Sequence, residues 1–530
     1  MALTKADREF RHPGVTAISY RTLDMDRVLT GFLMRLWHYG DTSRISRSGL
    51  LTIDDYTDTI AEHPELFSAF DPDITRRWLE THLLDLVNRG KSTQAVAGLR
   101  PLHGFTYRLR NSRFSQPRGA DEQLYAMLRA EQRPGGIGVL QFLREFFFNG
   151  MDEVTGKAAA NDQIDVETQA LINLTGAANE HITDRAAGDV PVFHPPLYAE
   201  ASTLLVEDTI RLLYHKDLIP RSVLVEYLKI LFAFHLALYH LRCAKLLPHL
   251  VAGDPAPKTA GFFLDVAGVS GTSVAALAER SAASWYDRFP DFIRATFIIR
   301  KLDEFAQSLV KRKKISRPVG GVFRVPELLE FLGKDFAQER EQFAGARITR
   351  ILEDLPSDEE DATEQIRELG LDDFTTYIEM ITTYRVGFHF AYLRECVDSL
   401  LLKNRPGAMI TQPKQAQRRF ILDSRLLEVL LQIALLGPDG KGGFRTIPLR
   451  VDEFLDILRE RYGLHIDQLP DGDGFGKATI ADHLALRSNT RAFVERLREI
   501  GFYSDLSDAY VTQTITPRYV VGAATESGQQ

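Results

Sequence analysis

Cysteine is almost absent from this chain of 530 residues, which contains only Cys243 and Cys396. Both stand in apolar stretches with helical spacing. A scaffold held by disulfides does not fit this pattern, and a reducing compartment does. The N-terminal residues, MALTKADREFRHPG, also lack the apolar core of a secretory signal peptide. These absences predict a cytoplasmic protein.

Long hydrophobic runs without charge are missing as well. The most apolar stretch, Val223–Val251, is interrupted by Glu226, Lys229, Arg242 and Lys245. A membrane-spanning helix rarely carries four charged side chains. We therefore expect a buried pair of helices here and no membrane partner.

An excess of positive charge is the third absence. The chain has 64 Lys and Arg against 72 Asp and Glu, which gives a formal net charge of −8. This balance excludes a uniformly basic, histone-like nucleic-acid binder. Local basic patches remain compatible with it.

Recognisable catalytic motifs are also missing. The sequence contains no His-Glu-x-x-His, Gly-x-Ser-x-Gly or Cys-x-x-Cys motif. His235, His240, Cys243 and His249 lie close together, but His235 and His240 are five residues apart, which places them on different faces of a helix. Hydrogen-bonded core histidines are favoured over a metal site. We expect no catalytic residues, no cofactor and no metal.

What the sequence does contain is helical periodicity over most of its length. A hydrophobic content of 44% is ordinary for a globular protein, and 530 residues exceed what one core usually supports. We predict a mostly α, multidomain protein with winged-helix-like modules at both ends. The expected divisions are an N-terminal module (1–120), an irregular connector (121–200), a central helical domain (201–404), a basic linker (405–420), a C-terminal winged-helix module (421–520) and a disordered tail (521–530).

The N-terminal module is predicted from three helices and a hairpin. An apolar helical face runs through Met25–Trp37 after Asp24, which is an N-cap residue type. Further helices are expected near residues 53–61 and 73–88. The segment Ala95–Asn111 alternates around two glycines and predicts a β-hairpin. Three helices followed by a hairpin is a winged-helix order.

The C-terminal module is predicted from the same order of elements. Helices are expected at 426–436, around 454–462, and from Ser488 or Asn489 onward, with strands at 444–449, 502–503 and 510–515. Five apolar residues should share one core: Phe454, Leu458, Phe493, Leu497 and Ile500. This order is again that of a winged helix.

The segment from Leu86 to Ala120 carries the clearest signal for nucleic acid. It has no acidic residue, and Phe105, Tyr107 and Phe114 are interleaved with its basic ones. Basic and aromatic side chains on a hairpin can hold phosphates along a groove. A basic surface that docks an acidic partner is the alternative. The predicted DNA contacts are the seven basic residues of this segment: Arg89, Lys91, Arg100, Arg108, Arg110, Arg113 and Arg118.

The third helix of the C-terminal module supplies a second candidate surface. It carries Arg487, Asn489, Arg491 and Arg498, residue types that suit base edges, and Arg491 is predicted to contact DNA. However, residues 423–518 hold 12 basic and 15 acidic residues, and the expected wing turn itself is acidic. A winged helix that docks a protein fits this balance equally well.

Two further motifs have simpler structural interpretations. The basic cluster Lys311–Lys314, with Arg317, stands at the expected end of a helix, where cations complement the helix dipole. The segment Gly268–Ser273 resembles a phosphate-binding loop but has no lysine after its second glycine. A strand-to-helix turn capped by Thr272 or Ser273 is favoured over a nucleotide site.

Three segments carry a family resemblance. They are LREIGFYSDLSDAYVTQTITPRY, FFLDVAGVSGTSVAALAERS and LKILFAFHLALYHLR. Together they resemble accessory, non-catalytic proteins of multi-gene bacterial antiphage defence islands, of the kind built around DNA methylation or modification and a helicase. The resemblance implies a subunit that helps a defence complex to recognise DNA or to assemble.

Three functional hypotheses follow. The first is a non-enzymatic scaffold or adaptor of a bacterial antiphage complex that contacts DNA and partner proteins. The second is a winged-helix transcriptional regulator whose central helices sense a ligand. The third is an enzyme of unrecognised type.

Overall fold

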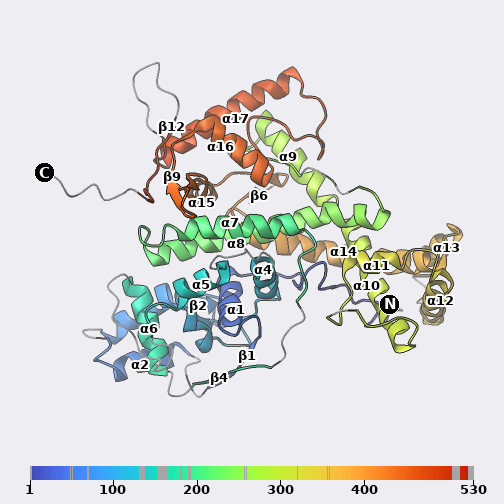
Figure 1. Cartoon of the computed structure of the whole chain (residues 1–530), viewed down its shortest axis with the longest axis horizontal. Helices are drawn as coiled ribbons and strands as arrows, with labels where there is room; N and C mark the ends of the chain where they lie inside the picture. The colour runs from blue at the N-terminus through green and yellow to red at the C-terminus, as the bar shows by residue number, and fades with distance from the viewer. Residues whose placement is uncertain are drawn as a thin grey trace.

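The computed structural model describes most of the chain, and helices dominate it (Figure 1). The helical fold class predicted from the sequence is confirmed. The described residues are 3–47, 49, 52–67, 71–129, 138–151, 164–178, 182–188, 193–255, 257, 260–318, 320–354, 356, 359–414, 416–503 and 514–522.

The N-terminal part is a helical layer with two short strand pairs. Helix α1 begins as expected, because the Asp24 side chain accepts a hydrogen bond from the Asp26 backbone. β1 pairs with β4 and β2 pairs with β3, both antiparallel. The elements are α1 (Met25–Trp37), β1 (Ser43–Arg47), α2 (Ile53–Glu62), α3 (Pro72–Trp78), the π-helix η1 (Leu79–Leu83), β2 (Leu84–Val87), β3 (Ala95–Leu99), the 3₁₀-helix η2 (Gly104–Leu109), α4 (Ala120–Arg129), α5 (Val139–Phe148), α6 (Val166–Ala178) and β4 (Ile182–Ala186).

The hairpin predicted over Ala95–Asn111 is wrong, because only the first half of this segment is a strand. Its first half is strand β3, but β3 pairs with β2, which the sequence pattern had assigned to the end of a helix. The second half forms η2, which places Phe105 and Tyr107 in the core. The alternation around Gly104 therefore reflects burial of aromatic rings in η2, whereas Gly98 lies within strand β3. The N-terminal winged helix is not confirmed.

The centre of the molecule is α8 (Arg221–Ala252), one continuous helix where a pair was predicted. Pro248 lies inside this helix, four residues before its end. By length and composition α8 could cross a membrane, yet 83% of its most apolar window is buried inside the protein. Figure 1 shows α7 (Ala199–Leu213) and α8 running between the N-terminal helices and the C-terminal part.

Of the other central helices, α10 and α14 pack against α8 and against each other. α12 packs on α14 and also contacts α10, where Phe343 lies against Phe305. The segment 325–353 forms two helices, α11 and α12. The elements are β5 (Phe262–Phe263), α9 (Ser273–Tyr286), α10 (Phe289–Lys311), α11 (Val325–Glu330), α12 (Ala337–Glu353), α13 (Glu360–Glu368) and α14 (Asp373–Leu401).

The segment 405–420 is packed and does not have the character of an open linker. It contains the antiparallel pair β6 (Ile410–Thr411) and β7 (Arg419–Phe420). Met409 and Ile410 are fully buried, and Arg419 is buried beside Asp265. The basic composition of this segment was a misleading sign of a linker, because Arg419 pairs with the buried Asp265.

The C-terminal part follows directly from β7. The predicted core is confirmed for Phe454, Leu458, Phe493 and Leu497, which are all buried, while Ile500 is partly buried against them. The last helix begins eight residues before Ser488. The elements are α15 (Ser424–Ala434), β8 (Leu436–Pro438), β9 (Phe444–Thr446), β10 (Leu449–Arg450), α16 (Val451–Ile457), the π-helix η5 (Leu458–Tyr462), β11 (Leu464–His465), α17 (Ile480–Glu499) and β12 (Thr514–Ile515).

The strands of this part pair in an unexpected way. β10 pairs with β12, as the first and last strands of a winged helix would. β11, however, pairs with β5 of the central part, in parallel. The predicted wing turn at Asp505–Asp508 and the tail from residue 523 lie outside the described residues. The C-terminal winged helix is therefore not confirmed.

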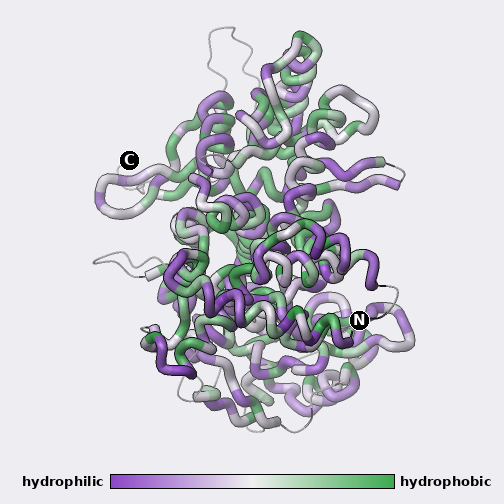
Figure 2. Tube along the Cα trace, turned by 90° about the vertical axis from the view of Figure 1, so that its right-hand side faces the viewer, coloured by the Kyte–Doolittle hydropathy of each residue, from purple (hydrophilic) through white to green (hydrophobic). Residues whose placement is uncertain are grey.

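One hydrophobic cluster extends from the N-terminal segment through the central helices to β12. Hydrophobic residues concentrate towards the middle of the molecule, and hydrophilic ones lie mostly at its periphery (Figure 2). The three parts of the chain therefore share a continuous core.

Buried neutral histidines should make this core sensitive to acid. Burial lowers the pKa of His240 to about 4, and unfolding would return it to an ordinary value of about 6.5. Because the folded pKa is the lower one, the unfolded state binds more protons between these values, and stability falls as the pH drops from 6.5 towards 4. We expect a loss of about 3 kcal/mol at pH 4 from this group alone. Urea unfolding at several pH values measures it, and a free energy that stays constant below pH 6.5 would contradict it.

Candidate nucleic-acid interface

The structure separates the seven basic residues that the sequence grouped together. Arg100 donates to Glu226 of α8 at 2.8 Å, and the Nε of Arg108 lies 3.3 Å from Asp184 of β4. Arg110 is half-buried, and burial lowers its pKa while Asp121 opposes the shift. Carboxylates from distant parts of the chain thus neutralise Arg100 and Arg108.

Asp184 is the centre of a polar cluster that fixes Arg108. It accepts hydrogen bonds from Ser43 and Tyr107, and His38 lies 3.1 Å away. Burial alone would raise the pKa of Asp184, but the hydrogen bonds from His38, Ser43 and Tyr107 outweigh it and lower that pKa. Asp184 is therefore ionised at neutral pH and holds Arg108 against the protein.

The remaining four basic residues are exposed and form no ion pair among the described residues. Arg89 and Lys91 lie on the turn between β2 and β3. Arg113 follows a segment in which Asn111 donates to the Ala97 carbonyl. Arg118 lies elsewhere, because its carbonyl accepts a hydrogen bond from the Ser19 backbone.

The C-terminal candidates are also divided. Arg491 and Arg487 are exposed and line a shallow hollow on α17. Asn489 is fully buried: it accepts from the Val266 backbone and donates to the carbonyls of Leu264 and Ile466. The suggestion that Asn489 reads a base is wrong, because all these side-chain contacts are internal.

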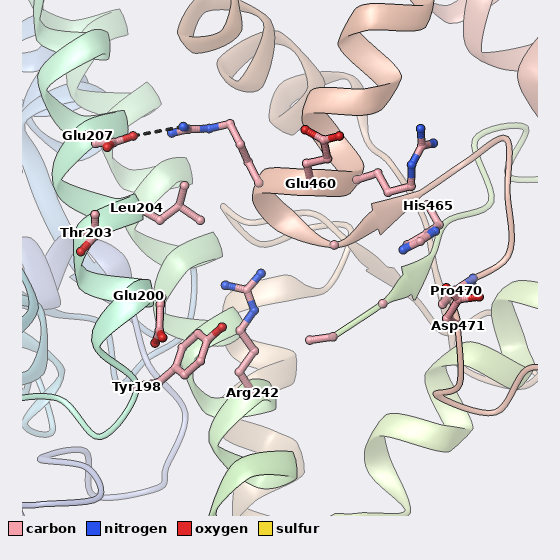
Figure 3. Close-up of a pocket in the computed structure, with 15 residues that line it drawn as sticks. Tyr198, Glu200, Thr203, Leu204, Glu207, Arg242, Glu460, His465, Pro470 and Asp471 are labelled. Carbon is pink, nitrogen blue, oxygen red and sulfur yellow. Dashed lines mark hydrogen bonds and ion pairs between the residues drawn. The ribbon is translucent and has the colours of Figure 1, made fainter. Parts of the chain in front are cut away.

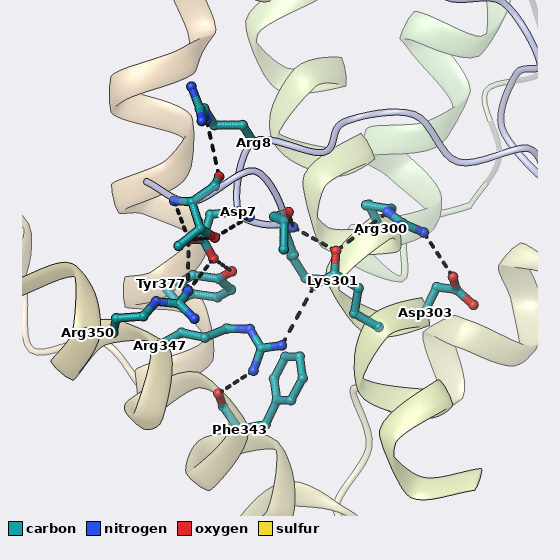
Figure 4. A network of polar contacts seen from close by, with 12 residues as sticks. Asp7, Arg8, Arg300, Lys301, Asp303, Phe343, Arg347, Arg350 and Tyr377 are labelled. Carbon is teal, nitrogen blue, oxygen red and sulfur yellow. Dashed lines mark hydrogen bonds and ion pairs between the residues drawn. The ribbon is translucent and has the colours of Figure 1, made fainter. Parts of the chain in front are cut away.

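The structure also reveals an N-terminal arm, residues 3–23, that lies across the central helices. Asp7 anchors it in a polar network: the buried carboxylate accepts from Tyr377 of α14 at 2.7 Å and from Arg350 of α12 at 2.8 Å (Figure 4). Burial raises the pKa of Asp7, but hydrogen bonds from Thr4 and Tyr377 together with Arg350 bring it below its ordinary value. The arm is thus held in place by a charged, hydrogen-bonded group.

From this anchor the arm continues beside α14. Phe10 stacks on His389 with 4.2 Å between ring centroids. Further along, Thr22 donates to Glu395, and the Leu23 backbone donates to Ser399. Side chains of the arm and of α14 therefore form one surface.

An arginine–aromatic strip, made of Arg21, Arg385, Phe388 and Tyr392, lies on this surface. The guanidinium of Arg385 lies 4.1 Å from the Phe388 ring centroid, and that of Arg21 lies 4.0 Å from the Tyr392 centroid. The two rings are 4.5 Å apart. Phe388 is 42% exposed. The strip therefore alternates cations and aromatic rings at the surface.

Five arginines on and around the strip have no ion-pair partner among the described residues. Arg8, Arg11, Arg21, Arg118 and Arg385, which we call the basic surface, form no ion pair with any described carboxylate. Burial, and next the charge of Arg8, lower the pKa of Arg385, whose buried Nε has no hydrogen-bond partner among the described residues. Arg11 donates to the Ala17 carbonyl, close to Ser19 and Arg118. An anion would satisfy these groups.

Sequence reasoning missed most of this surface because its members come from three separate segments. Only Arg118 belonged to the predicted set. The spacing of Arg385, Phe388 and Tyr392 by three and four residues was a usable signal, since it places them on one helical face. The contribution of Arg8, Arg11 and Arg21 depends on the path of the arm.

The other motifs take the simpler interpretations. Thr272 caps α9 by accepting from the Ala275 backbone, which confirms the strand-to-helix turn. Arg419 donates to Ser270 and to the Gly268 carbonyl, so it fills the side of the turn where a ligand would bind. In the basic cluster after α10, Lys314 pairs with Glu339, and Lys311–Lys313 are exposed.

The core interpretation is confirmed for two of the three histidines. His235 lies 3.0 Å from Asp208, and His240 lies 3.0 Å from the Thr16 hydroxyl, both in the interior. Cys243 is buried as well, whereas His249 is only partly buried near Asp254. No group of three or more potential metal ligands occurs among the residues that the structure describes.

A family model described as methylation-associated defense system protein MAD7 matches residues 5–519. No curated protein and no solved structure matches the chain.

Proposed function

The chain belongs to the MAD7 family of methylation-associated defense system proteins, and we propose that it serves this system as a non-enzymatic, cytoplasmic subunit that contacts DNA. The family match covers nearly the whole chain and confirms the resemblance to antiphage defence proteins drawn from the sequence. It implies a role in antiviral defence. The absence of a recognisable catalytic motif in the sequence supports a role in binding.

The basic surface is the observation that carries the DNA part of the proposal. Five arginines lie there without a described carboxylate partner, in a protein whose net charge is −8. Contact with the Tyr392 and Phe388 rings restricts the side chains of Arg21 and Arg385, so that less side-chain entropy is lost when they meet phosphates. Phosphate contacts of this kind position a protein on DNA without reading its sequence.

Contact with partner proteins is supported by the C-terminal part. On α17, Ile480 is 84% exposed and Leu484 is 63% exposed, one turn apart. Arg487 and Arg491 continue along the same helix. Exposed apolar side chains beside arginines are typical of protein interfaces, so we assign α17 to a protein partner. A winged-helix module that docks a protein remains our interpretation of residues 421–520.

The test is fluorescence anisotropy with a labelled DNA duplex over a range of salt concentrations. We expect Arg21→Ala/Arg385→Ala to weaken binding equally for unrelated sequences. Loss of two phosphate contacts should also reduce the salt slope by about 2. The matched control is Arg76→Ala/Arg450→Ala, which removes the same charge from two exposed arginines that are already paired with Asp54 and Asp452. This control should bind like the wild type.

Two outcomes would overturn the proposal. One is a wild-type protein that does not bind duplex DNA at low salt. The other is equal weakening in the control variant, which would mean that net charge alone matters. In either case an acidic protein partner would become the better explanation of the basic surface.

A further inference from the structure

A polar pocket of about 600 Å³ opens between the central helices and the C-terminal part. Figure 3 shows its two sides: Tyr198, Glu200 and Arg242 on one, and His465 with Asp471 on the other. The first group comes from the start of α7 and from α8, and the second from β11 and the loop after it. The pocket therefore joins segments more than 200 residues apart in the chain, and its volume is within the usual range for small-molecule sites.

The walls of the pocket are fixed by an unusual backbone. The π-helix η5 supplies Arg459, Glu460 and Arg461, and Gly463 ends it with a φ of 73°. A Cβ at Gly463 would lie 1.9 Å from the Ala260 carbonyl oxygen, so only glycine allows this approach. π-helical turns often occur at functional sites.

Arg242 is a buried cation that forms no ion pair with any residue the structure describes. It is 9% exposed, its guanidinium donates to the Tyr462 carbonyl at 2.9 Å, and its Nε has no partner. No described carboxylate lies within ion-pair distance of it. Burial lowers the pKa of Arg242, while the fields of Tyr198 and Glu200 oppose that shift. A bound anion would offset the desolvation of this group.

The neighbouring polar groups differ from Arg242. Arg461 pairs with Glu207 and Asp208, and Arg459 pairs with Asp467, so these two cations are already matched. Burial lowers the pKa of His465 to about 4, which leaves a neutral imidazole at pH 7. Its Nδ1 is buried and has no described partner. His465 therefore lines the pocket as a neutral ring and adds no charge to it.

The rim of the pocket has the opposite charge. Glu200, Glu460 and Asp471 are exposed, and none of them forms an ion pair with a described residue. Among the described lining residues, the unpaired charges are thus one cation inside and three carboxylates at the mouth. A ligand that matches this pattern carries an anionic group at its inner end and cationic groups at its outer end.

The geometry points to a binding site for a small zwitterion with excess positive charge, of which free arginine and lysine are the simplest examples. The carboxylate of such a molecule meets Arg242 and its cationic side chain faces Glu200 and Glu460. A ligand bound there contacts both α8 and the C-terminal part. This assignment is independent of the DNA contact.

The test is isothermal titration of the full chain with L-arginine, with L-lysine and, as a probe lacking the carboxylate, with agmatine. We expect both amino acids to bind and agmatine to bind roughly 10- to 100-fold more weakly, because it cannot make the charge-assisted bond to Arg242. Arg242→Gln should weaken L-arginine binding by a similar factor. Arg242→Lys should recover part of it.

Because Arg242 is buried, its variants are first compared with the wild type by thermal unfolding without ligand. The exposed double variant Glu200→Gln/Glu460→Gln avoids that difficulty and should also weaken L-arginine binding. The inference is overturned if neither amino acid binds, if agmatine or inorganic phosphate binds as tightly as L-arginine, or if the double glutamine variant binds like the wild type.

Discussion

Replacing Asp265 with alanine should lower the free energy of unfolding by about 3–5 kcal/mol. Asp265 is fully buried, and its carboxylate lies 3.0 Å from the Nε of Arg419, whose side chain is 2% exposed. The same carboxylate accepts a hydrogen bond from the Gly268 backbone. Removing it leaves a buried guanidinium without its counterion, which is among the most destabilising changes in a protein. Urea unfolding measures the effect.

Two further variants isolate the cause. Asp265→Ala/Arg419→Met removes both charges and should recover part of the lost stability, since no unpaired ion remains. Asp452→Ala breaks an exposed pair with Arg450 and should change stability by less than about 1 kcal/mol. If Asp265→Ala behaved like Asp452→Ala, the buried pair would stabilise the fold no more than an exposed one does.

Asn489→Ala is expected to destabilise the protein by about 3 kcal/mol or more without changing DNA affinity. Its amide satisfies three backbone groups, namely the Val266 N–H and the carbonyls of Leu264 and Ile466, all within 3.0 Å. Each buried group left without a partner costs about 1–3 kcal/mol. Unfolding in urea gives the stability, and anisotropy with duplex DNA gives the affinity of the folded protein.

The neighbouring Arg491→Ala provides the matched control, because Arg491 is exposed on the same helix. It should change stability by less than about 0.5 kcal/mol. If the Asn489→Ala protein were as stable as the wild type but bound DNA more weakly, Asn489 would contact a base after all. The two variants thus separate a structural residue from a surface residue two positions away.

Much of the fold could be predicted from local patterns. Asp24 marks the start of α1, Thr272 caps α9, and the apolar spacing of Phe454, Leu458, Phe493 and Leu497 identifies one core. These features depend on neighbours a few residues away, where helical period and capping rules apply directly. Strands of two to five residues were harder, since β5 forms only because β11 lies beside it.

The candidate sites depended far more on tertiary structure. The seven basic residues between Leu86 and Ala120 form a group in the sequence but not in the folded protein. Glu226 and Asp184, which belong to other elements, neutralise Arg100 and Arg108. The basic surface and the polar pocket around Arg242 both combine segments that are far apart in the sequence. No window of the sequence contains either site.

The sequence by itself determined that this protein is mostly helical, has buried histidines in α8 and resembles antiphage defence proteins. Hydrophobic period, residue type and family patterns are properties of short segments, so they can be recognised without knowledge of the fold. Only the tertiary structure decided which charges are free. A charge is neutralised or exposed according to what lies within a few ångströms of it, and in a chain of this length those neighbours come from anywhere: Arg385 meets Arg8 and no described carboxylate, whereas Arg108 meets Asp184.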